Sequence, residues 1–288
     1  MQDHDHITAY ITHLTLRGLS PRYTAATRRT LARVAAALPV PLADADGADL
    51  LAWRTALTAG PATIGIYVSC VRGFYAWALD TGIVTGDPAA AVPVPKRPQL
   101  LPRPIAEDRL LDALARAPRR IRLCIVLAAW AGLRACEIAC LRVECIVPGT
   151  SPYLIITADA TKGSRERIVP LSGFVMAEIA AAGLPRRGWA FPRRDGRAGP
   201  CQPWMISHLC NDHLHGCGYP DTLHSLRHRF GTLTCRSEGL RTTMGLMGHR
   251  HPSSTVIYVA FSDPSGRAAV ESLPVPRKAR RLQERKAS

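Results

Sequence analysis

Two arginines, two histidines and a tyrosine occur in an order suited to chemistry on a phosphodiester: Arg134, His224, Arg227, His249 and Tyr258. Two guanidiniums can hold the non-bridging oxygens of a phosphate through paired hydrogen bonds. Fixed donors of this kind stabilise the negative charge that develops during attack on phosphorus. Tyr258 is the candidate nucleophile, and its reference pKa of about 10 means that it needs a proton acceptor. His224, three residues before Arg227 on one helix face, is the candidate base, and His249 a further phosphate donor.

Three short segments carry these residues. The first reads Gly-Leu-Arg-x-x-Glu, and we interpret its Glu137 as a residue that orients Arg134 or caps a helix. The second is His-x-x-Arg-His, in which His228 is expected to be a buried, hydrogen-bonded histidine. The third is Leu-x-Gly-His, and Tyr258 follows its histidine by nine residues.

The ordered set resembles the signature of the tyrosine recombinase (phage integrase) family. In that family a hairpin lysine lies between the first two boxes, and Lys162 occupies this place. The resemblance implies that Lys162 protonates the leaving 5′-oxygen and that Tyr258 forms a 3′-phosphotyrosine. A second 5′-hydroxyl then reverses the chemistry, so strands are exchanged without ATP, metal or another cofactor.

The elements that position these residues are mostly helices. Apolar residues recur at helical spacing in residues 21–38 and 62–81, and two shorter segments, 7–16 and 50–57, complete an N-terminal four-helix unit. Prolines and two basic residues then occupy 86–104, which indicates an extended linker or, alternatively, a long surface loop of one domain. Helices resume at Ile105, interrupted by a predicted hairpin whose strands are 153–157 and 167–171.

The fold class expected from these features is mainly α. Residues 1–85 are expected to form a helical DNA-binding domain, which the resemblance identifies as a SAM-like core-binding domain. Residues 105–273 are expected to form a mostly helical catalytic domain with a small β-hairpin or sheet. The last segment, 274–288, is expected to be a basic tail.

Composition agrees with a nucleic acid partner. The 288 residues include 37 lysines and arginines against 22 acidic residues, a formal charge of +15. This excess favours a polyanionic ligand, although a basic structural protein would share it. The polar start is unlike a signal peptide, and the run 123–133 is too short to cross a bilayer. We therefore expect a cytoplasmic protein without membrane contact.

Cysteine and histidine are crowded in one segment: His208, Cys210, His213, His215 and Cys217. The segment lacks the paired spacing of closed zinc sites, such as Cys-x-x-Cys. We interpret it as a helix with a polar face near DNA, and we expect no bound metal. Nine cysteines without an export signal indicate a reducing compartment rather than a disulfide framework.

Three functions compete at this point. The first is a site-specific recombinase, which the resemblance implies binds double-stranded DNA with inverted half-sites and assembles as a homotetramer. The second is a type IB topoisomerase, which uses nearly the same chemistry as a monomer. The third is a non-catalytic DNA-binding module, which has no need of Tyr258. The N-terminal helical unit favours the recombinase, but phage integration, transposition of a mobile genetic element and chromosome-dimer resolution stay open.

Overall fold

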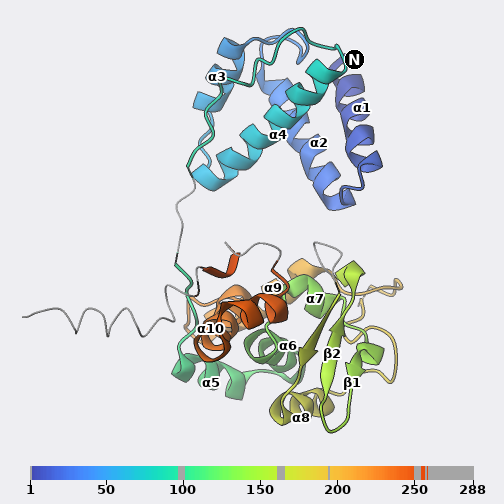
Figure 1. Ribbon diagram of the computed structural model, residues 1–288, viewed down its shortest axis with the longest axis vertical. Coiled ribbons are helices and arrows are strands. Elements are labelled where there is room, and N and C mark those ends of the chain that lie inside the picture. The colour runs from blue at the N-terminus through green and yellow to red at the C-terminus, as the bar shows by residue number, and fades with distance from the viewer. Residues whose placement is uncertain are drawn as a thin grey trace, which may run out of the picture. The chain divides into compact units, whose positions relative to one another are not determined.

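The structure, a computed structural model, describes residues 2–96, 101–160, 166–193, 195–249, 254–256 and 258. The chain divides into two compact units, residues 1–99 and 100–288 (Figure 1). Each unit has its own hydrophobic core. The mainly helical fold expected from the sequence is confirmed.

The first unit contains four helices. They are α1 (Gln2–Leu16), α2 (Pro21–Ala37), α3 (Gly47–Thr55) and α4 (Pro61–Asp80). Ser20 caps α2 through its side chain and Asp46 caps α3 in a reciprocal capping box, which satisfies backbone donors that the first helical turn leaves free. Helix α4 is long and apolar enough to cross a membrane by composition alone. Its buried Phe74 and Tyr75 instead make it the core helix of this unit.

The predicted linker, 86–104, begins as part of the first unit. Ala89 and Val92 are buried in that unit's core. Arg72 on α4 donates to the carbonyl oxygens of both residues, at 3.3 and 2.8 Å. At the other end of the stretch, Ile105 belongs to the core of the second unit, and its backbone N–H donates to Ser225. Described residues at the two ends of this stretch therefore pack against the cores of different units.

The second unit is built around one buried helix. Its helices are α5 (Glu107–Arg116), α6 (Arg119–Trp130), α7 (Ala135–Ala139), α8 (Gly173–Ala181), α9 (Pro203–Gly216) and α10 (Leu223–Met247), with 3₁₀ turns at Val143–Cys145 and Ala158–Ala160. Helix α6 is buried from Leu123 to Ala129 and packs against α8, α9 and α10. This core fixes the positions of the segments that follow α6 and begin α10.

A small antiparallel sheet lies in the second unit (Figure 1). The predicted hairpin forms between β2 (Tyr153–Ile156) and β3 (Arg167–Pro170), with Leu154 opposite Val169. A third strand, β1 (Ile146–Val147), pairs with β2 and was not expected from the sequence. The residues 161–165 between the hairpin strands, Lys162 among them, lie outside the described part of the chain.

Helix α10 is interrupted and ended by glycines. At Gly239 the backbone has φ +77° and ψ 177°, so two helical segments meet there at a kink. The helix ends at Gly248, whose φ of +60° is a left-handed conformation that glycine adopts at little cost. His249 therefore leaves the helix end in a new direction. Residues 254–256 are again helical, and so is Tyr258.

Candidate active site

Arg134 is held by a turn that only glycine permits. Helix α6 ends at Trp130, and Gly132 follows with φ +65°. A Cβ atom at Gly132 would also collide with the ring of Phe230 on α10. Arg134 then takes an extended conformation directly before α7, so its side chain projects from the turn.

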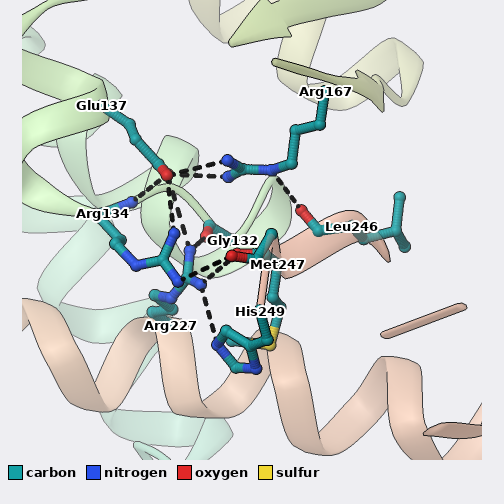
Figure 2. A network of polar contacts seen from close by, with 9 residues as sticks. Gly132, Arg134, Glu137, Arg167, Arg227, Leu246, Met247 and His249 are labelled. Atoms are coloured by element: carbon teal, nitrogen blue, oxygen red, sulfur yellow. Dashed lines mark hydrogen bonds and ion pairs between the residues drawn. The ribbon is translucent and has the colours of Figure 1, made fainter. Parts of the chain in front are cut away.

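Glu137 is the centre of the polar network in Figure 2. Its fully buried carboxylate accepts from the backbone N–H of Arg134 and from Nη1 of the same residue, each at 2.8 Å. Arg167 donates to both carboxylate oxygens, at 2.9 and 2.8 Å. Burial raises the pKa of Glu137, but the Arg167 bonds, the charge of Arg227 and the Arg134 N–H outweigh it and leave the pKa at about 2. Glu137 thus takes part in the capping box of α7 and also bonds to the Arg134 side chain, the two alternatives that its spacing left open.

Arg167 was not singled out in the sequence. It begins β3, and its guanidinium is nearly buried. Besides Glu137, its Nε donates to the carbonyl oxygen of Leu246 at 2.8 Å (Figure 2). Arg167 thus ties the hairpin to α7 and to the end of α10. Its only sequence signal is an arginine at the start of a predicted strand, and such residues are commonly solvated.

Arg227 lies under the same network and is 3% exposed. Its Nη1 donates to the carbonyl oxygen of Gly132, and its Nη2 donates to that of Met247 at 2.7 Å. Burial and the charge of Arg134 lower the pKa of Arg227 to about 9, so it still carries its charge at neutral pH. Three guanidiniums (Arg134, Arg167, Arg227) around one carboxylate leave two positive charges in excess. That excess matches an anionic ligand.

His249 joins the network from the position that follows Gly248, the C-cap of α10. Its Nε2 lies 3.3 Å from Nη2 of Arg227, and its Nδ1 lies 2.6 Å from Oγ1 of Thr255. Burial and the charges of Arg227 and Arg134 lower the pKa of His249 to about 4. The ring is therefore neutral at physiological pH.

Tyr258 is packed inside the unit, with 2% of its surface exposed. Its ring lies on Gly231 of α10, where a Cβ atom would come within 2.8 Å of the phenol carbon Cζ. The phenol oxygen lies 3.0 Å from Nδ1 of His228, and the ring is nearly parallel to that of His249, with centroids 6.4 Å apart. Burial raises the pKa of Tyr258 against the charges of Arg227 and Arg134.

The two histidines of α10 differ in their surroundings. The rings of His224 and His228 have centroids 4.2 Å apart, and His228 contacts Tyr258. Desolvation by the neighbouring protein atoms lowers the pKa of His224, and the charges of Arg227 and Arg134 lower it further. The side chain of His224 is still exposed to solvent. Burial, His224 and Arg227 lower the pKa of His228 to about 4. The sequence predicted a hydrogen-bonded His228 but not its contact with Tyr258.

The crowded cysteines and histidines lie on α9 and at its end, where Sγ of Cys217 is 3.8 Å from Nε2 of His213. Cys210 lies in the core, and His213 bonds through Nε2 to the carbonyl oxygen of Ala113 at 2.8 Å. His208 lies 3.3 Å from Asp212. Among the residues that the structure describes, no three histidine, cysteine or acidic side chains form a group that could hold a metal ion.

Arg134, Arg227, His249 and Tyr258 meet in this site, and His224 contacts it through His228. Comparison with known proteins shows which family the chain belongs to. Residues 105–264, more than half of the chain, match the model of the phage integrase family. The chain belongs to this family of tyrosine recombinases.

Relatives extend the family match beyond the second unit. The tyrosine recombinase XerC of Chromobacterium violaceum is 30% identical over 278 residues, which cover 88% of this chain and 89% of the relative. XerD of Xanthomonas campestris pv. campestris is 33% identical over 235 residues, covering 73% and 71%. A solved lambda integrase tetramer bound to a Holliday junction shares the fold with a TM-score of 0.71, at 19% identity and coverage of 87% and 78%.

Proposed function

We propose that this tyrosine recombinase cuts and rejoins DNA at specific sites, with Tyr258 as the nucleophile. The observation that carries the proposal is the placement of Tyr258 beside a cluster with two excess positive charges. An anion-binding cluster beside a phenol suits transfer of a phosphoryl group to the phenol oxygen.

In this proposal the scissile phosphate binds to Arg134 and Arg227. The Arg134 side chain is 32% exposed and reaches solvent, whereas Arg227 is anchored by two carbonyl oxygens beneath it. Glu137 holds Arg134 in place and offsets the repulsion among the three guanidiniums. Because these donors are fixed before DNA arrives, they need little rearrangement as charge develops on the phosphate.

The chemical step exchanges one ester for another. The Tyr258 oxygen forms a bond to phosphorus, the bond to the 5′-oxygen breaks, and a 3′-phosphotyrosine results. The phenol proton passes to a histidine of α10, which we assign as His224, and Lys162 protonates the departing 5′-oxygen. A 5′-hydroxyl from another strand then attacks the phosphotyrosine, and the same groups act in reverse.

The partner is double-stranded DNA, bound as inverted half-sites by a homotetramer. The formal charge of +15 suits a polyanion, and the lambda integrase neighbour is a tetramer on a Holliday junction. The XerC and XerD relatives are recombinases, which favours strand exchange over type IB topoisomerase activity. A complete set of arginines, histidines and tyrosine argues against a binding module without activity. We place the protein in the cytoplasm, a reducing compartment that would keep its nine cysteines as thiols.

The test is to map covalent adducts. The protein is incubated with DNA from its genomic neighbourhood, denatured, and assayed for DNA that carries protein at a single 3′-phosphate. Tyr258→Phe removes only the attacking oxygen, so it should bind DNA and form no adduct. Tyr219→Phe is the matched control, because Tyr219 bonds to Asp112 on the surface of α5. An adduct formed by Tyr258→Phe would assign the nucleophile to another residue.

A further inference from the structure

Thr255 is a fully buried residue three positions before Tyr258. Its hydroxyl oxygen lies 2.6 Å from Nδ1 of His249, and the other ring nitrogen, Nε2, lies 3.3 Å from Nη2 of Arg227. The imidazole of His249 is therefore held at both nitrogens. One neighbour, the guanidinium, can only donate a hydrogen bond, whereas the hydroxyl can donate or accept.

These two neighbours determine where the imidazole carries its hydrogen. The ring is neutral at physiological pH, because its pKa is about 4, and so it has a single N–H. Nε2 must accept from Arg227, which places the hydrogen on Nδ1, and Nδ1 then donates to Thr255. In this state the edge of His249 that faces the arginines has no hydrogen to offer a phosphate oxygen.

A bound phosphate requires the other tautomer of His249, with the hydrogen on Nε2. Its oxygens only accept hydrogen bonds, and they attract the N–H groups of Arg227 away from His249. To donate to the phosphate, His249 must carry its hydrogen on Nε2, which leaves Nδ1 as an acceptor. The half-buried ring can lose one proton to water at Nδ1 and gain one from water at Nε2, so its charge does not change.

We propose that Thr255 is a positioning residue that keeps His249 aligned in both tautomers. Its hydroxyl accepts from Nδ1 in the free protein, then rotates and donates to Nδ1 once the scissile phosphate is bound. A backbone carbonyl or a carboxylate in this place would only accept, and would hold the ring in the tautomer that cannot serve the phosphate. The inference rests on the proposed function in one respect, because it requires a phosphate at Arg134 and Arg227.

Single-turnover cleavage of the mapped site tests the role. Thr255→Val has nearly the same volume without the hydroxyl, and should slow cleavage by roughly 10–100-fold, the size of loss typical when the partner that orients a metal-binding histidine is removed. Thr255→Ser restores the hydroxyl and should cleave at close to the wild-type rate. Ser254→Ala is the matched control, because the neighbouring Ser254 side chain is exposed, and it should have no effect. Unchanged cleavage by Thr255→Val would overturn the proposal.

A double-mutant cycle separates positioning from a structural effect. If Thr255 acts through His249, adding Thr255→Val to His249→Ala should slow cleavage no further. If the rate loss of the double variant equals the product of the two single losses, Thr255 acts independently of His249 and the inference is refuted.

The tautomer itself can be measured by ¹⁵N NMR of histidine-labelled protein. We expect the His249 hydrogen on Nδ1 in the free protein and on Nε2 in the DNA complex. A hydrogen on Nε2 of the free protein, or one that stays on Nδ1 with DNA bound, would refute the inference. If wild-type protein forms no adduct on any DNA, the proposed function fails instead, and the free-protein spectrum still tests the tautomer.

Discussion

Nδ1 of His228 lies 3.0 Å from the phenol oxygen of Tyr258, so the proposed nucleophile is held in the free protein by a histidine one turn beyond His224. The pKa of His228 is about 4, and burial raises that of Tyr258 above its ordinary value of about 10. Both shifts oppose transfer of the phenol proton to His228 in the free protein. His228 therefore positions the phenol in the free protein without deprotonating it.

The first prediction separates the two histidines of α10. In His228→Asn the amide oxygen can replace Nδ1 as a hydrogen-bond acceptor but cannot take a proton, so cleavage should stay close to wild type. His228→Leu removes the bond and should slow cleavage. His224→Asn removes the assigned base and should slow cleavage by roughly 10²–10⁴-fold. Single-turnover rates measure all three. If His228→Asn is as slow as His224→Asn, the phenol proton passes to His228.

The second prediction concerns the buried carboxylate of Glu137. Glu137→Gln leaves three guanidiniums without their common counter-charge, and should destabilise the second unit by roughly 3–5 kcal/mol, as for other broken buried pairs. Urea unfolding measures the change. Glu107→Gln is the matched control, because Glu107 also accepts two bonds from an arginine, Arg229, but is 57% exposed. It should change stability by about 1 kcal/mol or less. Equal losses would contradict a special role for Glu137.

The third prediction is a loss of stability in acid that occurs in two steps. His228 and His249 have pKa values near 4 in the folded protein and about 6.5 when unfolded, so the unfolded chain takes up protons first. Stability should therefore fall as pH drops from about 6.5 to 4. The depressed pKa of Glu137 stabilises the fold above about 4.5, and this contribution is lost as pH falls toward 2.

Urea midpoints measured from pH 8 to pH 3 test the two steps. His249→Gln cannot take up a proton, so its midpoint should fall less than that of wild type between pH 6.5 and 4. A wild-type midpoint that stays constant over this range would contradict the neutral state of both histidines in the folded protein.

Contacts between residues a few positions apart in one motif could be predicted from the sequence, because spacing along one helix or turn is a local property. The pairing of Glu137 with Arg134 and the three-residue step from His224 to Arg227 belong to this class. The two strands of the hairpin were also predicted, from their β-prone composition.

Contacts made by tertiary packing could not be predicted in this way, because their residues do not lie within one helix or turn. Arg167 meets Glu137 across 30 positions, and only the pairing of β3 with β2 brings it there. Thr255 is one small polar residue among several near Tyr258, and nothing in the sequence indicates that it is buried against His249. The kink at Gly239 was also missed, because a single glycine inside a helical segment does not by itself indicate a kink.

The fourth prediction tests Lys162, which lies outside the described residues. Its assignment as general acid rests on its place in the predicted hairpin. If its ammonium protonates the departing 5′-oxygen, Lys162→Ala should slow cleavage by roughly 10²–10⁴-fold. A slower rate alone does not establish the role, because any positive charge near the phosphate would assist the reaction.

Replacing the 5′-bridging oxygen of the substrate with sulfur distinguishes the two explanations. A thiol has a reference pKa of about 8.5, far below that of an alcohol, so sulfur departs as a thiolate without receiving a proton. Lys162→Ala should therefore regain nearly wild-type cleavage on the sulfur substrate. Arg227→Ala is the control, and should stay slow on both substrates because its guanidinium stabilises charge on the phosphate. If Lys162→Ala stays equally slow on both, the general acid is another residue, with His249 as the next candidate because its Nε2 faces the phosphate site.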